Sequence, residues 1–170
     1  MTNIIETNRL FLRRPALEDA VILKGLWRDE KVREFLGGVL LDEAIQERIA
    51  ALQNHWEQYN FGLWAVFKRD FEEPIGLCGL HHTQDGLELS YLFFPKYWGQ
   101  GLAREATHAC LNYGFAVLKQ NFIISITQEA NLRSRYLLER MGMKPTHKFE
   151  RYNALQCLYK LSRDENLLLP

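Results

Sequence analysis

The chain has 170 residues and a mass of 20.0 kDa, which is the usual size of one domain. Its 21 basic residues balance 21 acidic ones, so it lacks the basic excess of proteins that bind nucleic acid or a membrane surface. Hydrophobic residues make up 47% of the chain, and this fraction excludes an intrinsically disordered protein.

The first half of the chain predicts one strand, then helices, then three strands in succession. Residues 9–14 alternate as a strand, and residues 17–36 form a helical stretch broken near Asp29 and ended by Gly37 and Gly38. Apolar side chains then recur every three or four residues over residues 42–59, which predicts a helix with one apolar face. The period changes to two in three strands, at residues 62–68, 75–80 and 87–94. The last of them is apolar on nearly both faces, so we expect helices on both sides of the sheet.

The second half predicts alternating helices and strands. We expect a helix over residues 102–118, a strand over 122–127, a helix over 131–141, and a closing pair of strands at 146–152 and 154–161. No internal repeat or linker divides the sequence, so residues 1–170 form a single domain in this interpretation. The order of elements predicts a mixed α/β domain whose longest strand lies in the middle, rather than a regular βαβ array.

Cysteine usage and the start of the chain predict where the protein works. Cys78, Cys110 and Cys157 form no CxxC pair, and their odd number suits neither a disulfide framework nor a thiolate zinc site. The N-terminal Ile4-Ile5 pair is too short for a signal peptide, and no apolar run approaches the roughly 18 residues of a transmembrane helix. We therefore expect a soluble, cytoplasmic protein with no membrane partner.

A glycine-rich turn at residues 98–104 directly follows the apolar strand and opens a helix. Glycines permit close backbone approach, and the free N–H groups and dipole of a helix start favour a phosphate, although an ordinary tight turn has the same pattern. A Walker loop requires Gly-Lys-Ser/Thr, whereas Leu102 and Ala103 follow Gly101 here. A dinucleotide fingerprint requires a small residue where Arg104 stands and an acidic residue after the next strand, and residues 121–125 contain none. Both nucleotide interpretations are therefore excluded.

The turn resembles the coenzyme A pyrophosphate loop of the GCN5-related N-acetyltransferase (GNAT) superfamily. Its RimJ/RimL-like, ribosomal-protein-type branch typically reads Tyr-Trp-Gly-x-Gly-x-Ala-x-Glu-Ala, which residues 97–106 match. Trp98 departs from the Gln or Arg of the general superfamily pattern. Further likenesses occur in the same order as in the family, at residues 7–13, 74–76, 87–91, 131–134 and 138–143. The resemblance covers nearly the whole chain and implies a GNAT-type acyl-CoA N-acyltransferase fold. In that fold, helices flank both faces of a central, mostly antiparallel, twisted sheet.

This resemblance implies an N-acetyltransferase that transfers the acetyl group of acetyl-CoA, its cosubstrate, directly to a primary amine. The acceptor is a protein N-terminus or a small-molecule amine, and the enzyme is a monomer or homodimer with no nucleic-acid partner and no metal. The resemblance places the acetyl-CoA-binding core at about residues 87–143, where the central strand separates from its neighbour and its backbone binds pantetheine. The implied cofactor-binding residues are Leu92, Phe93, Gly99, Gln100, Gly101, Leu102, Ala103, Arg104 and Asn131.

Glu88 is the candidate general base, because it interrupts an otherwise apolar strand and a buried carboxylate is costly unless it is paired or used. A lysine-like amine with a pKa of about 10.4 must lose a proton before it attacks, whereas an α-amine with a pKa of about 8 needs little help. The competing interpretation places Glu88 at the exposed start of its strand, after Asp85 and Gly86.

The general acid is less clearly marked. Much of the superfamily has a tyrosine seven residues after the Asn that opens the last helix, near the departing sulfur, and here that position is Leu138. Around the helix axis, Tyr136 points about 160° away from position 138. Ser134 faces the same side as Asn131 and is the better candidate for the general acid. Asn131 also suits a helix N-cap, and a CoA thiolate can leave without an acid. The missing tyrosine keeps open an alternative, a non-catalytic acyl-CoA sensor or interaction module on the same scaffold.

Two further features have both structural and functional interpretations. Alternation places Cys78 and His82 on one strand face and His81 on the other, so these three do not form a metal site, although one His can line an acceptor pocket. Trp27, Trp56 and Phe61 suit either the lining of an acceptor cleft or the core, and the core is the expected place.

Charge is unevenly distributed along the chain. Residues 131–163 hold eight basic and two acidic residues, while residues 1–95 hold 15 of the 21 acids. A basic flank suits the phosphates of CoA and an acidic first half suits a cationic acceptor, but solvated surface faces explain the pattern equally well.

Overall fold

The computed structural model describes residues 3–166 and confirms the mixed α/β class. Its strands form one sheet in the order β1-β2-β3-β4-β5-β6-β8-β7, in which β5 and β6 are parallel and all other neighbours antiparallel. The strands are β1 (Ile5–Glu6), β2 (Leu10–Arg13), β3 (Leu63–Lys68), β4 (Pro74–Thr83), β5 (Gly86–Phe93), β6 (Phe122–Gln128), β7 (Lys144–Arg151) and β8 (Ala154–Ser162).

The helices follow the predicted order. They are α1 (Ala20–Arg28), α2 (Glu30–Arg33), α3 (Asp42–Tyr59), α4 (Leu102–Ala116), α5 (Leu132–Arg140) and α6 (Arg163–Asn166), with a 3-10 turn η1 (Pro95–Tyr97) before α4. The predicted break at Asp29 is confirmed, because Asp29 has an extended backbone and its carboxylate accepts a hydrogen bond from the N–H of Val32. The same residue therefore ends α1 and caps α2.

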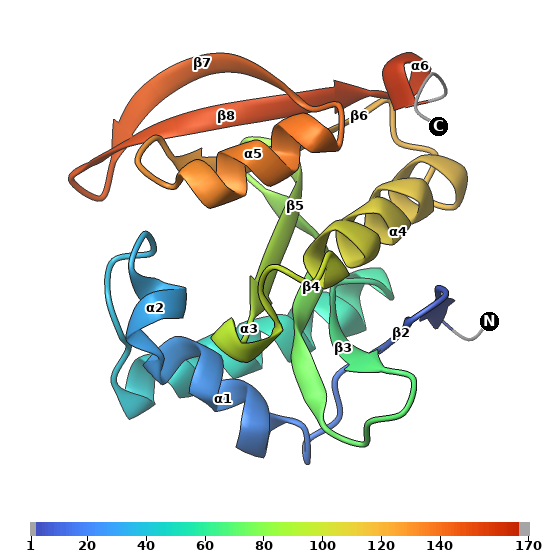
Figure 1. The fold of residues 1–170 in the computed structure, drawn as a ribbon, viewed down its shortest axis with the longest axis vertical. Coiled ribbons are helices and arrows are strands. Elements are labelled where there is room, and N and C mark those ends of the chain that lie inside the picture. Colours follow the sequence, from blue (N-terminus) through green and yellow to red (C-terminus); the bar gives the residue numbers. More distant parts are fainter. Residues whose placement is uncertain (1–2, 167–170) are drawn as a thin grey trace.

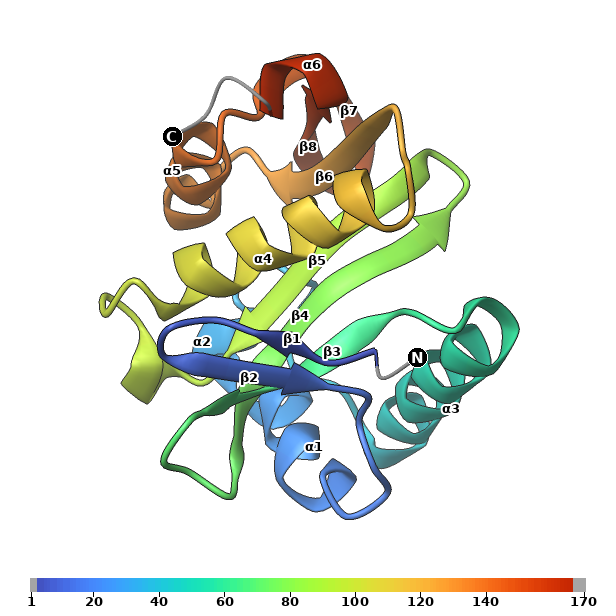
Figure 2. The same cartoon turned by 90° about the vertical axis from the view of Figure 1, so that its right-hand side faces the viewer.

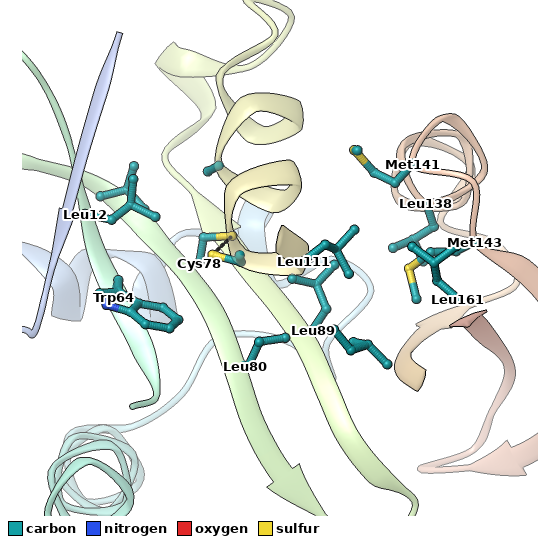
Figure 3. Close-up of a cluster of buried hydrophobic side chains, with 14 of the residues drawn as sticks. Leu12, Trp64, Cys78, Leu80, Leu89, Leu111, Leu138, Met141, Met143 and Leu161 are labelled. Atoms are coloured by element: carbon teal, nitrogen blue, oxygen red, sulfur yellow. Dashed lines mark hydrogen bonds between the residues drawn. The ribbon is translucent and has the colours of Figure 1, made fainter. Parts of the chain in front are cut away.

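Helices cover both faces of the sheet, as the two-sided apolarity of β5 predicts (Figures 1 and 2). On one face, residues of α1, α2 and α3 pack against β3 and β4 around Leu26, Ile45 and Leu77. On the other face, α4 and α5 pack against the sheet around Leu89, Leu111 and Leu138, as Figure 3 shows in close-up. The sheet is thus the middle layer of the domain.

The expected core residues are buried. Trp27, Trp56 and Phe61 are each at most 6% exposed, although Trp27 and Trp56 also border a surface pocket between α1 and α3. Cys78 on β4 and Cys110 on α4 are fully buried with their sulfurs 3.6 Å apart, a contact that spacing alone did not predict. Burial raises the pKa of the Cys78 thiol well above its ordinary value, so this thiol stays protonated and unreactive.

The sheet is locally open between β5 and β6. These strands pair only at Glu88 and Ile124, whereas β5 pairs with β4 along its whole length. Figure 1 shows β5 leading from the N-terminal strands in the lower part of the view toward β6, β8 and β7 in the upper part. Beyond Leu89, the backbone of β5 that faces β6 has no strand partner on that side.

None of the helices within residues 3–166 combines the length and apolarity needed to cross a lipid bilayer.

Candidate active site

The glycine turn between η1 and α4 presents a row of free backbone donors. Gly99 and Gly101 have φ values of +73° and +74°, a left-handed conformation that glycine adopts without strain. Gly101 is the N-cap of α4 and supplies no side-chain cap, and the first helical hydrogen bond runs from the N–H of Glu105 to its carbonyl. Within the described structure, no acceptor is bonded to the N–H groups of residues 99–104. Uncapped donors at the positive end of a 15-residue helix form a site for an anion.

A clamp from the N-terminal strands fixes this turn. The Arg9 guanidinium donates to the Gln100 carbonyl at 2.9 Å and to the Glu105 carboxylate at 2.6 Å. Thr7 and the backbone N–H of Arg9 also donate to Glu105. Burial acts to raise the pKa of Glu105, but these hydrogen bonds outweigh it and hold that pKa below its ordinary value. The clamp stabilises the turn fully at pH values above the ordinary pKa of a glutamate. This stabilisation is lost as the pH falls through the lowered pKa of Glu105.

The alternation of hydrogen bonds along β5 determines which of its backbone groups face β4 and which face the open side of the sheet. Phe94 donates its N–H to the Ile75 carbonyl on β4, and alternation therefore also directs the N–H and C=O of Leu92 toward β4. The backbone groups of Tyr91 and Phe93 point the other way, toward the side where β6 has separated. Of the two predicted pantetheine contacts, Leu92 thus has its backbone groups directed toward β4, whereas Phe93, like Tyr91, faces the open side. The Phe93 carbonyl already accepts a hydrogen bond from the Trp98 indole at 2.8 Å. The backbone N–H of Phe93 is therefore the group that is left to bind a ligand.

The start of α5 meets β5 through a pair of hydroxyl groups. Asn131 caps the helix by accepting the N–H of Ser134 at 3.1 Å, so its N-cap interpretation is confirmed. The Ser134 hydroxyl lies 2.7 Å from the Tyr91 hydroxyl, across the side on which β5 and β6 separate. Burial raises the pKa of Tyr91 well above its ordinary value, so the phenol stays protonated. Ser134 therefore belongs to a two-hydroxyl group that can donate a proton or hydrogen bond.

The position of the family's tyrosine is part of the core. Leu138 is fully buried, and Figure 3 shows its side chain beside Met143 and Leu161. Tyr136 is 64% exposed, as its angle on the helix predicts. In this chain the phenol nearest to Ser134 comes from β5, at Tyr91.

Glu88 lies on the face of β5 opposite to Tyr91, because side chains alternate along a strand. It is half-buried, so the exposed-start interpretation is wrong. Burial raises the pKa of Glu88 to about 7, and the nearby Asp85 adds to the rise. Interactions with the Ile126 backbone, Arg151 and Ser90 act in the opposite direction. A carboxylate with a pKa near 7 accepts and releases protons at neutral pH, as a general base must.

The histidines and Cys78 are separated, as alternation predicts. Cys78 is in the core, His81 contacts the Ser90 hydroxyl at 2.8 Å, and His82 is exposed beside the rings of His55 and Tyr59. In the described part of the chain, no three His, Cys, Asp or Glu side chains gather closely enough to hold a metal ion.

The basic residues of the C-terminal region differ in their distance from the glycine turn and in their contacts. Arg133, in the first turn of α5, stacks on the Trp98 ring at 4.1 Å and so lies beside the glycine turn. Several others are paired with acids on the surface, namely Lys144 with Glu165, Lys148 with Glu129, and Arg151 with Asp85. The surface interpretation of this basic segment therefore holds for these three residues, whereas Arg133 and the exposed Arg104 provide cationic charge near the turn.

The site combines a splayed parallel strand pair, a helix start with free N–H donors, and a carboxyl group with a raised pKa. These features together are those of an acyl-group transferase. Residues 9–144 match the acetyltransferase (GNAT) domain, and the chain belongs to this family.

Curated and solved relatives agree with this assignment. The chain is 29% identical over 150 residues to YoaA of Bacillus subtilis, an uncharacterized N-acetyltransferase, covering 85% of this chain and 84% of that protein. An acetyltransferase of Agrobacterium tumefaciens superposes with a TM-score of 0.86 at 21% identity, over 95% of both chains. Spermidine N-acetyltransferase of Vibrio cholerae, solved with CoA and spermine, superposes at 0.80 with 16% identity, over 95% of this chain and 99% of that one. These two structures share the fold.

Proposed function

We propose that this protein is an N-acetyltransferase that transfers the acetyl group of acetyl-CoA directly to a primary amine. The observation that carries the proposal is the row of free N–H donors at residues 99–104, together with the unpaired edge of β5. The helix start binds the diphosphate, and Arg104 and Arg133 contribute positive charge nearby. The N–H groups of Tyr91 and Phe93 bind pantetheine and polarise the thioester carbonyl.

The two faces of β5 divide the chemistry. The carrier lies on the side of α4 and α5, where Tyr91 and Ser134 are positioned to stabilise the departing sulfur. The amine approaches from the face of Glu88, which takes its proton directly or through one water. The amine nitrogen then forms a bond to the thioester carbon, the carbon–sulfur bond breaks, and CoA leaves as a thiolate that receives a proton from the hydroxyl pair or from water.

The pKa of Glu88 favours an acceptor with an α-amino group. The pKa of an α-amine lies about one pKa unit above that of a base with a pKa of about 7, whereas the pKa of a lysine-like amine lies more than three pKa units above it. Proton transfer to Glu88 is therefore less uphill from an α-amine. The charged side chains that act on Glu88 and its neighbour His81 are Asp85, Arg48 and Arg151, which do not give the acidic excess that a polyamine needs. We therefore propose a protein or peptide N-terminus as acceptor, as in the RimJ/RimL-like branch, in the reducing cytoplasm that suits three free thiols.

A thermal-shift titration followed by a product assay tests this function. Acetyl-CoA at 100 times its dissociation constant stabilises the fold by about 2.7 kcal/mol, which raises Tm by several degrees. With lysine-free peptides that begin with Ser, Ala or Met, mass spectrometry is expected to find one added acetyl group, and CoA thiol is released in equal amount. Peptides already acetylated at the N-terminus are the control and stay unmodified.

Other outcomes identify the alternatives. Acetyl-CoA binding without turnover on peptides, spermidine or amino sugars indicates the non-catalytic acyl-CoA sensor. Acetylation of spermidine in preference to every peptide contradicts the proposed acceptor class but not the transferase activity. Absence of any acetyl-CoA binding contradicts the proposal as a whole.

A further inference from the structure

Three polar side chains lie together on one face of the β4–β5 ladder. His81 and Glu88 are directly opposite each other in the register, and Ser90 lies two residues beyond Glu88 on the same face. The Ser90 hydroxyl is 2.8 Å from Nε2 of His81, and interaction with the Ser90 side chain acts to lower the pKa of Glu88. Ser90 therefore connects the imidazole to the carboxyl group.

The direction of these hydrogen bonds follows from the number of protons available. A carboxylate only accepts hydrogen bonds, so Ser90 lowers the pKa of Glu88 only if its single hydroxyl proton points to the carboxylate. The Ser90 oxygen then accepts from His81, which requires the neutral tautomer with its proton on Nε2. Burial lowers the pKa of His81 to about 4, and the neighbouring His55, His82 and Arg48 also disfavour a charge on this ring. The imidazole is thus a neutral donor at physiological pH.

None of the described residues that act on the pKa of His81 is a carboxylate that could stabilise a charged ring. From α3 come His55 and Arg48, and from β4 comes His82. His55 itself is occupied, because one ring nitrogen contacts the Phe61 carbonyl and the other accepts the N–H of His82. Around Glu88 the corresponding groups are Asp85, in the turn before β5, and Arg151 at the end of β7, with the Ile126 backbone of β6.

We propose that His81 is a positioning residue for Glu88 and acts through Ser90, in a chain of hydrogen bonds donated from imidazole to hydroxyl to carboxylate. The inference rests on the proposed function, in which Glu88 is the general base. The chain fixes the carboxylate and stabilises its charged form before the amine arrives. When the amine's N–H bond breaks, the proton bonds to a Glu88 oxygen, and it passes to solvent after the product leaves. His81 gains and loses no proton in the cycle.

Two spectroscopic measurements on the free protein test the chain. Nitrogen-15 NMR is expected to show His81 as the Nε2–H tautomer throughout the neutral pH range. Carbon-13 titration of the Glu88 carboxyl, assigned by comparison with Glu88→Gln, is expected to show an upward pKa shift of about one unit in Ser90→Ala. His81→Leu is expected to give a smaller rise, and His81→Gln, whose amide N–H donates, to restore part of the wild-type value. Ser125→Ala removes a buried hydroxyl that bonds the Leu89 carbonyl instead, and it leaves the Glu88 titration unchanged.

The pH profile of kcat/KM with acetyl-CoA and an acceptor peptide completes the test. The acidic limb of the profile is expected to move upward in Ser90→Ala by the same amount as the carboxyl titration. An Nδ1–H tautomer of His81, or an unchanged Glu88 titration in Ser90→Ala, overturns the chain. If Glu88→Gln is fully active, the base assignment fails instead, while the tautomer and the carboxyl titration still decide whether the chain exists.

Discussion

Replacing Glu88 by Gln is expected to lower kcat/KM by about 100-fold to 10 000-fold, the usual contribution of a general base. The amide keeps the shape of the side chain but cannot take a proton from the attacking amine. In the wild type, the carboxylate form is the active one and the pKa of Glu88 is raised to about 7. Activity is therefore expected to be full above pH 8 and to fall about tenfold per pH unit below pH 6. Steady-state kinetics with a lysine-free peptide over pH 5.5 to 9 measure both effects.

The same substitution provides its own stability control. Because the pKa of Glu88 is raised in the fold, the native state holds this proton more tightly than the unfolded chain does. The contribution of Glu88 to the free energy of unfolding therefore falls as the pH rises from the unfolded pKa toward 7. At pH 8, Glu88→Gln is thus expected to keep or raise Tm and to bind acetyl-CoA with unchanged affinity. The exposed Glu73→Gln is the matched variant and leaves activity unchanged. Full activity in Glu88→Gln contradicts the assigned role.

Replacing Gly99 by Val is expected to weaken acetyl-CoA binding at least tenfold, which corresponds to about 1.4 kcal/mol. Gly99 has a φ of +73°, a left-handed conformation that β-branched residues avoid at a cost of about 1–2 kcal/mol. The turn is expected to relax by rotating this backbone, so that the N–H groups of residues 99–104 no longer converge on one anion. Isothermal titration calorimetry with acetyl-CoA measures the loss.

A matched control separates this effect from strain. Gly37 has a φ of +83°, and a Cβ at Gly37, as at Gly99, meets no atom within 4 Å. Gly37→Val therefore imposes the same kind of backbone strain in the segment that follows α2, far from the turn in sequence. Both variants are expected to lose similar Tm, but only Gly99→Val loses affinity. Equal affinity in the two variants would show that the glycine turn does not hold the cofactor.

Local patterns in the sequence predicted most of the fold. The break at Asp29 and the two-sided burial of β5 follow from short-range signals, which are turn chemistry and side-chain period. The glycine turn at residues 98–104 also follows, since two glycines between an apolar strand and an amphipathic helix indicate a tight turn. These features depend on neighbours within about one helical turn, which the sequence displays directly.

Features that depend on register and distant contacts were missed. Whether the backbone of Leu92 or that of Tyr91 faces the open side of β5 depends on which groups β4 occupies, and a shift of one residue reverses the orientation. The clamp between Arg9 and Glu105 joins residues that are 96 positions apart in the sequence. The matched loop pattern includes the acid at Glu105, but it does not identify Arg9 as its partner. Tyr91 and Ser134 are 43 residues apart, and only the fold brings their hydroxyls together.

Amide NMR of the free protein titrated with CoA and with pantetheine tests the central claim most directly. CoA carries the diphosphate and pantetheine does not. If the start of α4 binds the diphosphate, the amide protons of residues 99–104 shift strongly with CoA and hardly at all with pantetheine, while those of Tyr91 and Phe93 shift with both. Saturable CoA binding that leaves the amides of residues 99–104 unchanged would contradict the account.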